Sequence, residues 1–271
     1  MTQTLEAEPT ITTPPETAQP PTPRRRSLYM WLLLILVALI VLLGVANLGI
    51  GAIKALGKPV SGSPGNLLYA TTFDQNFGDE WTVFDGQMAS RVVDGSLRLA
   101  NESVSDGPFS VLKYEFADFD VRVNATRLVT ADSYDEIGLL FRHHDPSNFY
   151  MFNIRGDGAY RVIQRKNGQI EVKSEWHVSP AVLQGLNVVN QLRVVAHGDH
   201  FQFFINGQNL LLCPNGPGKE QSTWNGDKCL SNNGQTSTVL QDSTFQTGNI
   251  GVGIRVAGLQ VAFDNIVIYA P

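Results

Sequence analysis

Short alternations of apolar and polar residues, cut by turn signals, run from position 67 to the end of the chain. Clear examples are FDVRVNATRLV, FYMFNIR, HFQFFIN and LQVAFDNIVIYA. Asp94-Gly95, Asn167-Gly168 and Asn206-Gly207 separate such runs and are typical of tight β-hairpins. The pattern predicts about a dozen strands at a spacing of about 8–12 residues, with no helical period. We therefore expect residues 67–271 to form an all-β domain, an antiparallel two-sheet jelly-roll sandwich.

The same alternation assigns the two faces of each strand, because successive side chains point to opposite sides. We expect core-facing side chains at Tyr150, Phe152, Ile154, Phe201, Phe203 and Ile205. We expect outward-facing side chains at Arg142, Asn153, Arg155 and Gln164. These four would make a polar, slightly basic surface, which is either a binding face or the ordinary solvated face of a sandwich.

The N-terminal part of the chain follows a different pattern. Residues 28–50 are an apolar run whose only polar interruption is Asn47. A helix of about 20 apolar residues, rising about 1.5 Å per residue, spans a hydrocarbon core of about 30 Å. The run therefore predicts one transmembrane α-helix over residues 27–52. A cleaved signal peptide is the alternative, but its apolar stretch is typically about 7–15 residues and ends at a small-residue cleavage site.

Charged residues near this helix set its expected orientation. An arginine triplet at 24–26 precedes the apolar run, and Lys54 and Lys58 follow it. Basic residues stay mostly on the cytoplasmic side, so we expect a cytoplasmic N-terminus, a bilayer-spanning helix and an extracytoplasmic domain at the cell membrane. Residues 1–26 are rich in Thr and Pro and predict a disordered tail, and residues 53–66 predict a Gly/Ser/Pro linker.

The net charge of the domain limits the classes of ligand that we expect it to bind. From position 59 onward the chain has 15 basic and 22 acidic residues, a net charge of −7. We expect no nucleic-acid partner, because binding to phosphates depends on clustered Lys and Arg.

Both cysteines of the chain, Cys213 and Cys229, lie in the domain. Outside the cytosol such a pair predicts a disulfide, which would staple an inserted loop of about 16 residues and contribute about 3 kcal/mol. Two unpaired thiols are the alternative. A zinc site would need further Cys or closely spaced His ligands, which the sequence does not offer.

Three motifs in the middle of the domain resemble a known family. They are GLLFR at 138–142, DPSNFY at 145–150 and GAY at 158–160, and the opening TTFDQNFGDEW and the closing VAFDNIVIYA fit the same pattern. The domain resembles concanavalin A-like, laminin-G-like jelly rolls and, more distantly, 3-keto-disaccharide hydrolase-like domains. The resemblance implies the fold more strongly than the function, because this fold hosts lectins, carbohydrate-binding modules, glycanases and adhesion domains.

A glycan is the ligand that such domains most often imply, and aromatic faces beside polar groups are what sugars need. Trp224 is the most suggestive tryptophan, because it lies inside the loop bounded by the cysteines. Trp81 and Trp176 flank strands, where packing at the rim is the more ordinary role. We therefore predict a ligand-binding set of Tyr134, Arg142, Asn153, Arg155, Gln164 and Trp224.

No catalytic constellation stands out. Laminarinase-like retaining glycosidases of this fold carry carboxylates two residues apart on one strand, about 5 Å from each other. Here Asp135 and Glu136 are adjacent and should face opposite ways. No Ser/His/Asp set is recognisable either, so we expect no catalytic residue of these types.

One metal site follows from the resemblance. The first and last strands pair in such jelly rolls, and a structural Ca²⁺ often sits near that junction. Asp74 and Asp264 are the candidate ligands for this ion. Turn-capping aspartates are the alternative, and we expect no cofactor to be required.

Three functions remain open. The favoured hypothesis is a single-pass, membrane-anchored module that binds a glycan or another surface component without catalysis. The second is an accessory subunit that binds a membrane protein partner through the sandwich. The third is a sugar hydrolase of the 3-keto-disaccharide hydrolase-like type.

Overall fold

The computed structural model describes residues 59–74, 79–103, 107–130, 132–216 and 221–271. The predicted tail over 1–26, the predicted transmembrane helix over 27–52 and the first part of the predicted linker lie outside these residues. Among the residues described, no helix combines the length and the apolar character that crossing a bilayer requires. The rest of the predicted linker lies against the domain, where the Val60 N–H donates to the Glu115 carbonyl at 2.6 Å.

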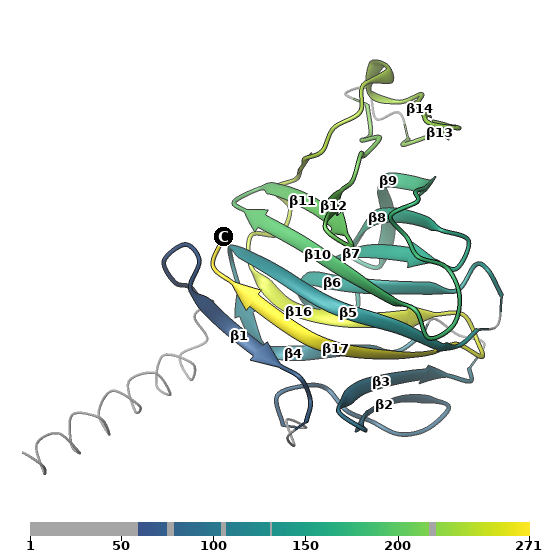
Figure 1. The fold of residues 1–271 in the computed structure, drawn as a ribbon. Helices are drawn as coiled ribbons and strands as arrows, with labels where there is room; N and C mark the ends of the chain where they lie inside the picture. Colours follow the sequence, from purple (N-terminus) through teal and green to yellow (C-terminus); the bar gives the residue numbers. More distant parts are fainter. Residues whose placement is uncertain (1–58, 75–78, 104–106, 131, 217–220) are drawn as a thin grey trace, which may run out of the picture. The chain divides into compact units, whose positions relative to one another are not determined.

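Two antiparallel sheets make up the described fold (Figure 1). The six-stranded sheet has the order β4 (Phe109–Phe116), β16 (Gly248–Arg255), β6 (Glu136–Asp145), β7 (Asn148–Arg155), β8 (Ala159–Lys166) and β9 (Gln169–Val178). The nine-stranded sheet has the order β12 (Gln208–Asn209), β11 (His200–Ile205), β10 (Val189–His197), β5 (Phe119–Val129), β17 (Gln260–Tyr269), β3 (Ser96–Asn101) and β2 (Met88–Val93), with β1 (Leu67–Thr71) on β17 and β15 (Leu240–Gln241) on β11. The predicted all-β jelly-roll sandwich is confirmed.

Smaller elements complete the fold. A short hairpin joins β13 (Trp224–Asn225) to β14 (Lys228–Cys229), and a single 3₁₀ turn, η1, follows at Asn232–Gly234. The three predicted hairpin turns are present, and both residues of each have positive φ: Asp94-Gly95, Asn167-Gly168 and Asn206-Gly207. That geometry matches the right-handed twist of the strands which such turns connect.

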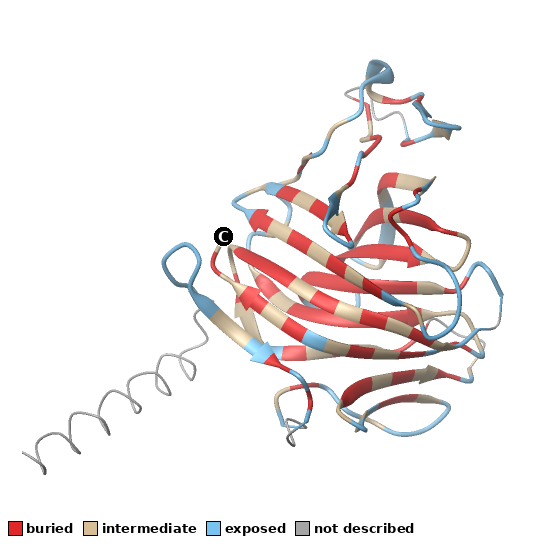
Figure 2. Cartoon of the chain, in the orientation of Figure 1, coloured by how far each residue is buried: buried red, intermediate tan, exposed pale blue. Residues whose placement is uncertain are grey.

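The core lies between the two sheets, and Figure 2 shows buried and less buried residues alternating along the strands. All six side chains predicted to face the core are fully buried. Aromatic rings from the two sheets meet directly: Phe141 and Phe201 lie 5.3 Å apart between ring centroids, and Phe152 and Phe203 lie 5.2 Å apart. Full burial of one such side chain stabilises the fold by about 1.5–3 kcal/mol, so these contacts hold the sheets together.

The prediction that Arg142 faces outward is wrong. Arg142 has a φ of 47°, and the register of β6 shifts at this point, so the bulge turns its side chain toward the core. The guanidinium donates to the carbonyls of Phe245, Ala117 and Gly198 at 2.5, 2.9 and 2.7 Å. It also lies over the ring of Phe201 at 4.9 Å. Arg142 therefore ties three connecting segments, those between β4 and β5, β10 and β11, and β15 and β16, to β6.

The prediction that Gln164 faces outward is also wrong. On β8 the side chain of Gln164 alternates with the outward ones and shares a face with Tyr160 and Val162, which are in the core. The register pairs Gln164 with the core residue Tyr150, and the side chain is 1% exposed. Strand alternation decided its direction in spite of its polarity.

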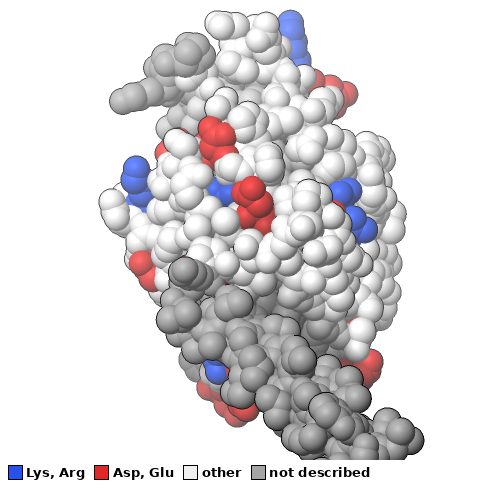
Figure 3. Space-filling view, turned by 90° about the vertical axis from the view of Figure 1, so that its left-hand side faces the viewer, with Lys and Arg blue, Asp and Glu red and all other residues white. Residues whose placement is uncertain are grey.

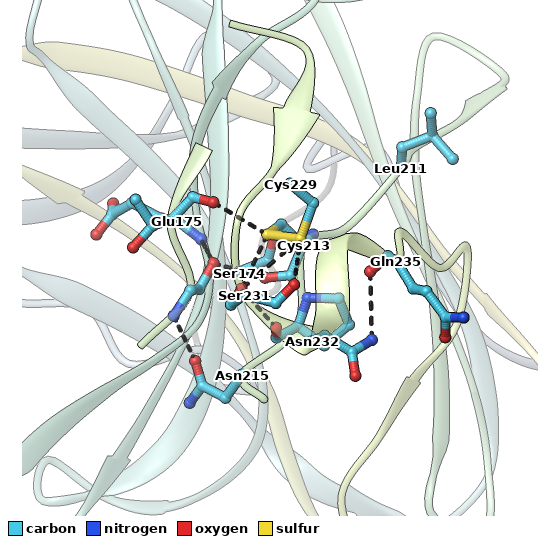
Figure 4. The surroundings of a disulfide bond; sticks show 12 residues. Ser174, Glu175, Leu211, Cys213, Asn215, Cys229, Ser231, Asn232 and Gln235 are labelled. Carbon is cyan, nitrogen blue, oxygen red and sulfur yellow. Dashed lines mark hydrogen bonds between the residues drawn. A yellow bond between two sulfur atoms is a disulfide. The ribbon is translucent and has the colours of Figure 1, made fainter. Parts of the chain in front are cut away.

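The predicted disulfide between Cys213 and Cys229 is present, and both cysteines are buried (Figure 4). Its loop lies along the free edge of β9. The Cys213 N–H donates to Ser174 Oγ at 3.1 Å, and the Glu175 N–H donates to Ser222 Oγ at 2.7 Å. The stapled loop thus covers part of the last strand of the six-stranded sheet, which protects that edge from pairing with another chain.

Candidate functional site

We call the side of the six-stranded sheet that faces away from the core the outer face. Because the strands pair in register, side chains on this face form rows across the sheet. The first row is Arg255, Glu136 and Arg155; the second is Gly253, Gly138, Asn153 and Arg161; the third is Gly251, Leu140, Met151, Ile163 and Val172. The third row is apolar and packs into a small cluster of its own with Phe109 and Phe149.

The first two rows form a cluster that we call the polar corner: Glu136, Asn153, Arg155, Arg161 and Arg255. Glu136 lies at its centre. Its carboxylate accepts from Arg161 Nη2 at 3.0 and 3.2 Å and lies 3.6 Å from Arg255 Nη1. Asn153 Nδ2 approaches the same carboxylate at 3.5 Å.

Two aromatic rings join this corner to the edge of the sheet. The guanidinium carbons of Arg155 and Arg161 lie 4.2 and 4.4 Å from the ring centroid of Trp176. Arg155 also lies 4.8 Å from the ring of Tyr134, whose side chain is 59% exposed. Asp157 holds Arg155 in place through bonds of 2.5 and 3.2 Å. The rings are thus fixed by cation–π contacts.

Burial shapes the electrostatics of the corner. The Glu136 and Arg161 side chains are 15% and 13% exposed. Burial lowers the pKa of Arg161, and the neighbouring Glu136 carboxylate opposes that effect. A buried ion pair is weak evidence for stability, because removing both charges from water costs about as much as their attraction returns. The stability of the domain therefore does not by itself explain this pair of charges on an outward face.

Three predicted ligand residues, Tyr134, Asn153 and Arg155, come together at this corner. Trp224 does not join them. Trp224 lies on the stapled loop and stacks on His177, with the ring centroids 4.0 Å apart and the ring planes inclined by 17°. Arg142 and Gln164 belong to the core, as described above. Binding of a ligand by any of these residues stays a prediction.

Four members of the site are outside the predicted ligand set: Glu136, Arg161, Trp176 and Arg255. Of these, Trp176 was considered from the sequence and assigned a packing role. Glu136 and Arg161 could have been found by placing their apolar neighbours Ile137 and Val162 in the core, whereas assigning Gln164 outward puts Arg161 on the wrong face of β8. Trp176 follows an irregular register between β8 and β9, which hides its face in the sequence. Arg255 is far along the chain, and only the pairing of β16 with β6 brings it here.

The adjacent carboxylates Asp135 and Glu136 face opposite ways, as predicted. Asp135 is fully buried, accepts from Thr130 Oγ1 and lies 3.8 Å from Arg127 Nε. The two side chains therefore do not form the facing pair that a retaining glycosidase uses.

The candidate calcium ligands lie near the pairing of β1 with β17. Asp264 accepts from the N–H and the Nδ2 of Asn265, and Asp74 accepts from Thr72 Oγ1. Burial raises the pKa of Asp264, and the charge of Asp74 adds to this effect. Within the described ranges, no group of three or more His, Cys, Asp or Glu is arranged to hold a metal. Bound Ca²⁺ stays a prediction.

Acidic and basic atoms are interspersed on the side of the domain that Figure 3 shows. In the polar corner a single carboxylate, that of Glu136, lies beside both Arg161 and Arg255. The corner therefore offers mainly hydrogen-bond donors, with Glu136 as its acceptor.

Comparison with known proteins extends this picture. The family model for the 3-keto-alpha-glucoside-1,2-lyase-like domain matches residues 69–269. No curated protein matches the chain.

Solved structures share the fold at low identity. A Bacillus subtilis protein of unknown function with a galectin-like fold is 13% identical, with a TM-score of 0.50, over 77% of this chain and 97% of that one. The carbohydrate-binding module CBM66 of Bacillus subtilis is 19% identical, with a TM-score of 0.49, over 70% and 95%. A putative glycosyl hydrolase of Parabacteroides distasonis is 17% identical, with a TM-score of 0.47, over 75% and 100%.

Proposed function

We propose that this chain, which belongs to the 3-keto-alpha-glucoside-1,2-lyase-like domain family, is a glycan-binding module that acts without catalysis. The ligand lies on the polar corner of the outer face. The observation that carries this proposal is the position of Trp176, which Arg155 and Arg161 hold beside Glu136 and Asn153.

The corner has the groups that a sugar ring requires. The apolar C–H face of a sugar packs on an aromatic ring, and its hydroxyls need both donors and acceptors. Trp176 and Tyr134 supply rings, the arginines supply donors, and Glu136 supplies acceptors; Asn153 is fully buried and supports Glu136. Because these side chains already hold one another, little side-chain entropy is lost on binding. The names of the similar structures, a carbohydrate-binding module among them, support the same ligand class.

The proposal includes attachment to the cell membrane. Residues 27–52 cross the bilayer, the N-terminus lies in the cytoplasm and the domain binds its ligand outside. The length of the apolar run and the arginine triplet before it support this arrangement. The disulfide supports it too, because such bonds persist outside the reducing cytosol.

A sugar lyase or hydrolase is the second candidate, and the family description favours it. Glu136 is the carboxylate of the polar corner and would be the proton acceptor. The test incubates the full chain with 3-keto-glucosides and follows the sugar signals by NMR. Turnover that Glu136→Gln abolishes would establish the enzyme and overturn the non-catalytic proposal.

The binding test is a glycan array probed with the full chain in lipid nanodiscs. We expect binding to a defined set of glycans and a loss of about 30-fold in affinity for Trp176→Ala, the size typical of a central aromatic contact. Phe204→Ala is the matched control, because Phe204 belongs to β11 of the other sheet and likewise has an arginine, Arg193, over its ring at 4.5 Å. No glycan binding, or equal losses in the two variants, would contradict the proposal.

A further inference from the structure

A hollow lies on the outer face, at the opposite end of β6 from the polar corner. Its volume is about 410 Å³. Lys113 and Phe109 come from β4, His143 and His144 from the end of β6, Asn249 from β16, and Thr82 from the segment before β2. We call this hollow the donor pocket.

Two irregularities in the sheet open the pocket at the same point. Along β16, Asn249 and Gly251 are two residues apart. The residues that face them on β4, Glu115 and Val111, are four residues apart, and those that face them on β6, His143 and Leu140, are three residues apart. Both neighbours of β16 therefore carry extra residues at this level. Bulges of this kind redirect side chains and are common beside functional sites.

The bulge of β6 decides which side chain reaches the pocket. Arg142 takes a left-handed backbone conformation and turns its guanidinium into the core, which leaves His143 on the outer face. Gly248 allows this, because a Cβ there would lie 2.5 Å from the carbonyl carbon of Arg142. A non-glycine residue held in this conformation costs free energy, and such strain is found most often at functional sites.

The pocket differs from the polar corner in the polar groups that line it. Its polar lining consists of an ammonium group, two imidazoles, an amide and a hydroxyl, and no carboxylate is among the described residues that line it. Two acids lie beside the pocket: Glu115 faces Asn249 across the pairing of β4 with β16, and Asp145 accepts from the Ser147 N–H and Asn148 Nδ2 in its own turn. A region rich in donors within a domain of net charge −7 favours an anionic ligand.

The imidazole of His143 lines the pocket and has a nitrogen that is not used in a hydrogen bond among the described residues. It is 9% exposed, its ring stacks on Phe149 at 5.9 Å, and its Nδ1 has no hydrogen-bond partner within the described part of the chain. Burial lowers the pKa of His143, with Asp145 opposing the effect, so the imidazole is neutral at pH 7. Lys113, which is exposed, supplies the positive charge of the pocket.

We propose that the donor pocket binds a sugar that carries a carboxylate, a uronic acid, with Lys113 pairing to the carboxylate. Asn249 and His144 bind the remaining oxygens, and the ring packs against Phe109. A volume of about 410 Å³ lies in the lower part of the range for small-molecule pockets and suits one or two sugar units. The inference deepens the proposed function and rests on it, because the glycan that reaches the polar corner would carry an acidic sugar.

The test measures binding of D-glucuronate and D-glucose to the full chain in nanodiscs by calorimetry. We expect glucuronate to bind at least about tenfold more tightly than glucose, and Lys113→Gln to reduce that affinity by about tenfold or more. Lys166→Gln is the matched control, since Lys166 is an exposed lysine at the β8–β9 turn. Equal binding of the two sugars, no binding of glucuronate, or equal effects of the two variants would overturn the inference.

Two further variants separate this inference from the proposed function. Asn249→Ala should weaken glucuronate binding, whereas Trp176→Ala should leave the binding of this monosaccharide unchanged and remove glycans from the polar corner. Loss of glucuronate binding in Trp176→Ala would overturn the assignment of the sugar to the donor pocket. Glycan binding that Trp176→Ala does not alter would overturn the proposed function and leave the glucuronate result in place.

Discussion

Asp242 links the segment after β15 to the six-stranded sheet, and replacing it with Asn should destabilise the domain by a predictable amount. Its carboxylate accepts from Tyr150 Oη at 2.5 Å, from Lys173 Nζ at 2.7 Å and from the Thr244 N–H at 2.8 Å. Burial by itself raises the pKa of Asp242, but the hydrogen bonds from Lys173 and Tyr150 outweigh it and bring the pKa down to about 2.

The size and sign of the effect follow from linkage. A pKa of about 2 in the folded state, against 3.8 in the unfolded chain, corresponds to about 2 kcal/mol of stability. The side chain is 10% exposed, so solvent screening is small. Because the folded pKa is the lower one, this stability is present above 3.8 and disappears as the pH falls toward 2.

The assay is denaturant unfolding of the full chain in mild detergent, followed by near-UV circular dichroism at a series of pH values. Asp242→Asn should lose about 2 kcal/mol at neutral pH, and the difference from the unaltered protein should shrink as the pH falls from about 5 to about 2. A loss below about 0.5 kcal/mol, or a loss that is the same at every pH, would refute the assignment of Asp242 as a charged link between the sheets.

Three other predictions concern the β6 bulge, the disulfide and the predicted membrane anchor. Gly248→Ala should destabilise the domain by more than about 2 kcal/mol, because a Cβ there meets the backbone of Arg142; a melting temperature close to that of the unaltered protein would contradict the bulge geometry. Replacing Cys213 and Cys229 with Ser should cost about 3 kcal/mol in the same unfolding assay, and an unchanged midpoint would show that the loop is held by other contacts. Deleting residues 27–52 should move the protein from the membrane fraction to the soluble fraction in cell fractionation, whereas continued sedimentation with membranes would argue against the predicted anchor.

Much of the sandwich could be predicted from the sequence, because strands and hairpins follow from local chemistry. The alternation in FYMFNIR and HFQFFIN assigned core faces correctly, and each predicted Asx-Gly turn has the positive φ values it needs. The disulfide followed from the presence of two cysteines in one domain.

The failures have physical causes. The direction of Arg142 depends on a bulge in β6. The backbone of Arg142 comes close to Gly248, which is far away in the sequence but lies on the neighbouring strand β16, and only a residue without a Cβ allows this approach. Gln164 was assigned by its polarity, although its place in the alternation of β8 puts it in the core. The direction of a strand residue is better predicted from its neighbours on the strand than from its own polarity.

The candidate site was only half predictable for a similar reason. Asn153 and Arg155 lie on one strand, so alternation found them. Glu136 and Arg161 lie on its two neighbours, and Arg255 lies one strand further away. The order of strands in the sheet brings these residues together, and a single sequence does not specify that order.

The most direct test of a glycan site on the outer face is the indole N–H spectrum of the full chain during a glycan titration. Each tryptophan gives one signal, so Trp176 at the polar corner is compared with Trp81, whose buried indole donates to Tyr69 Oη at 2.9 Å. We predict that a glycan which binds on the array shifts the Trp176 signal saturably and leaves the Trp81 signal in place. A glycan that binds without moving the Trp176 signal would contradict the account.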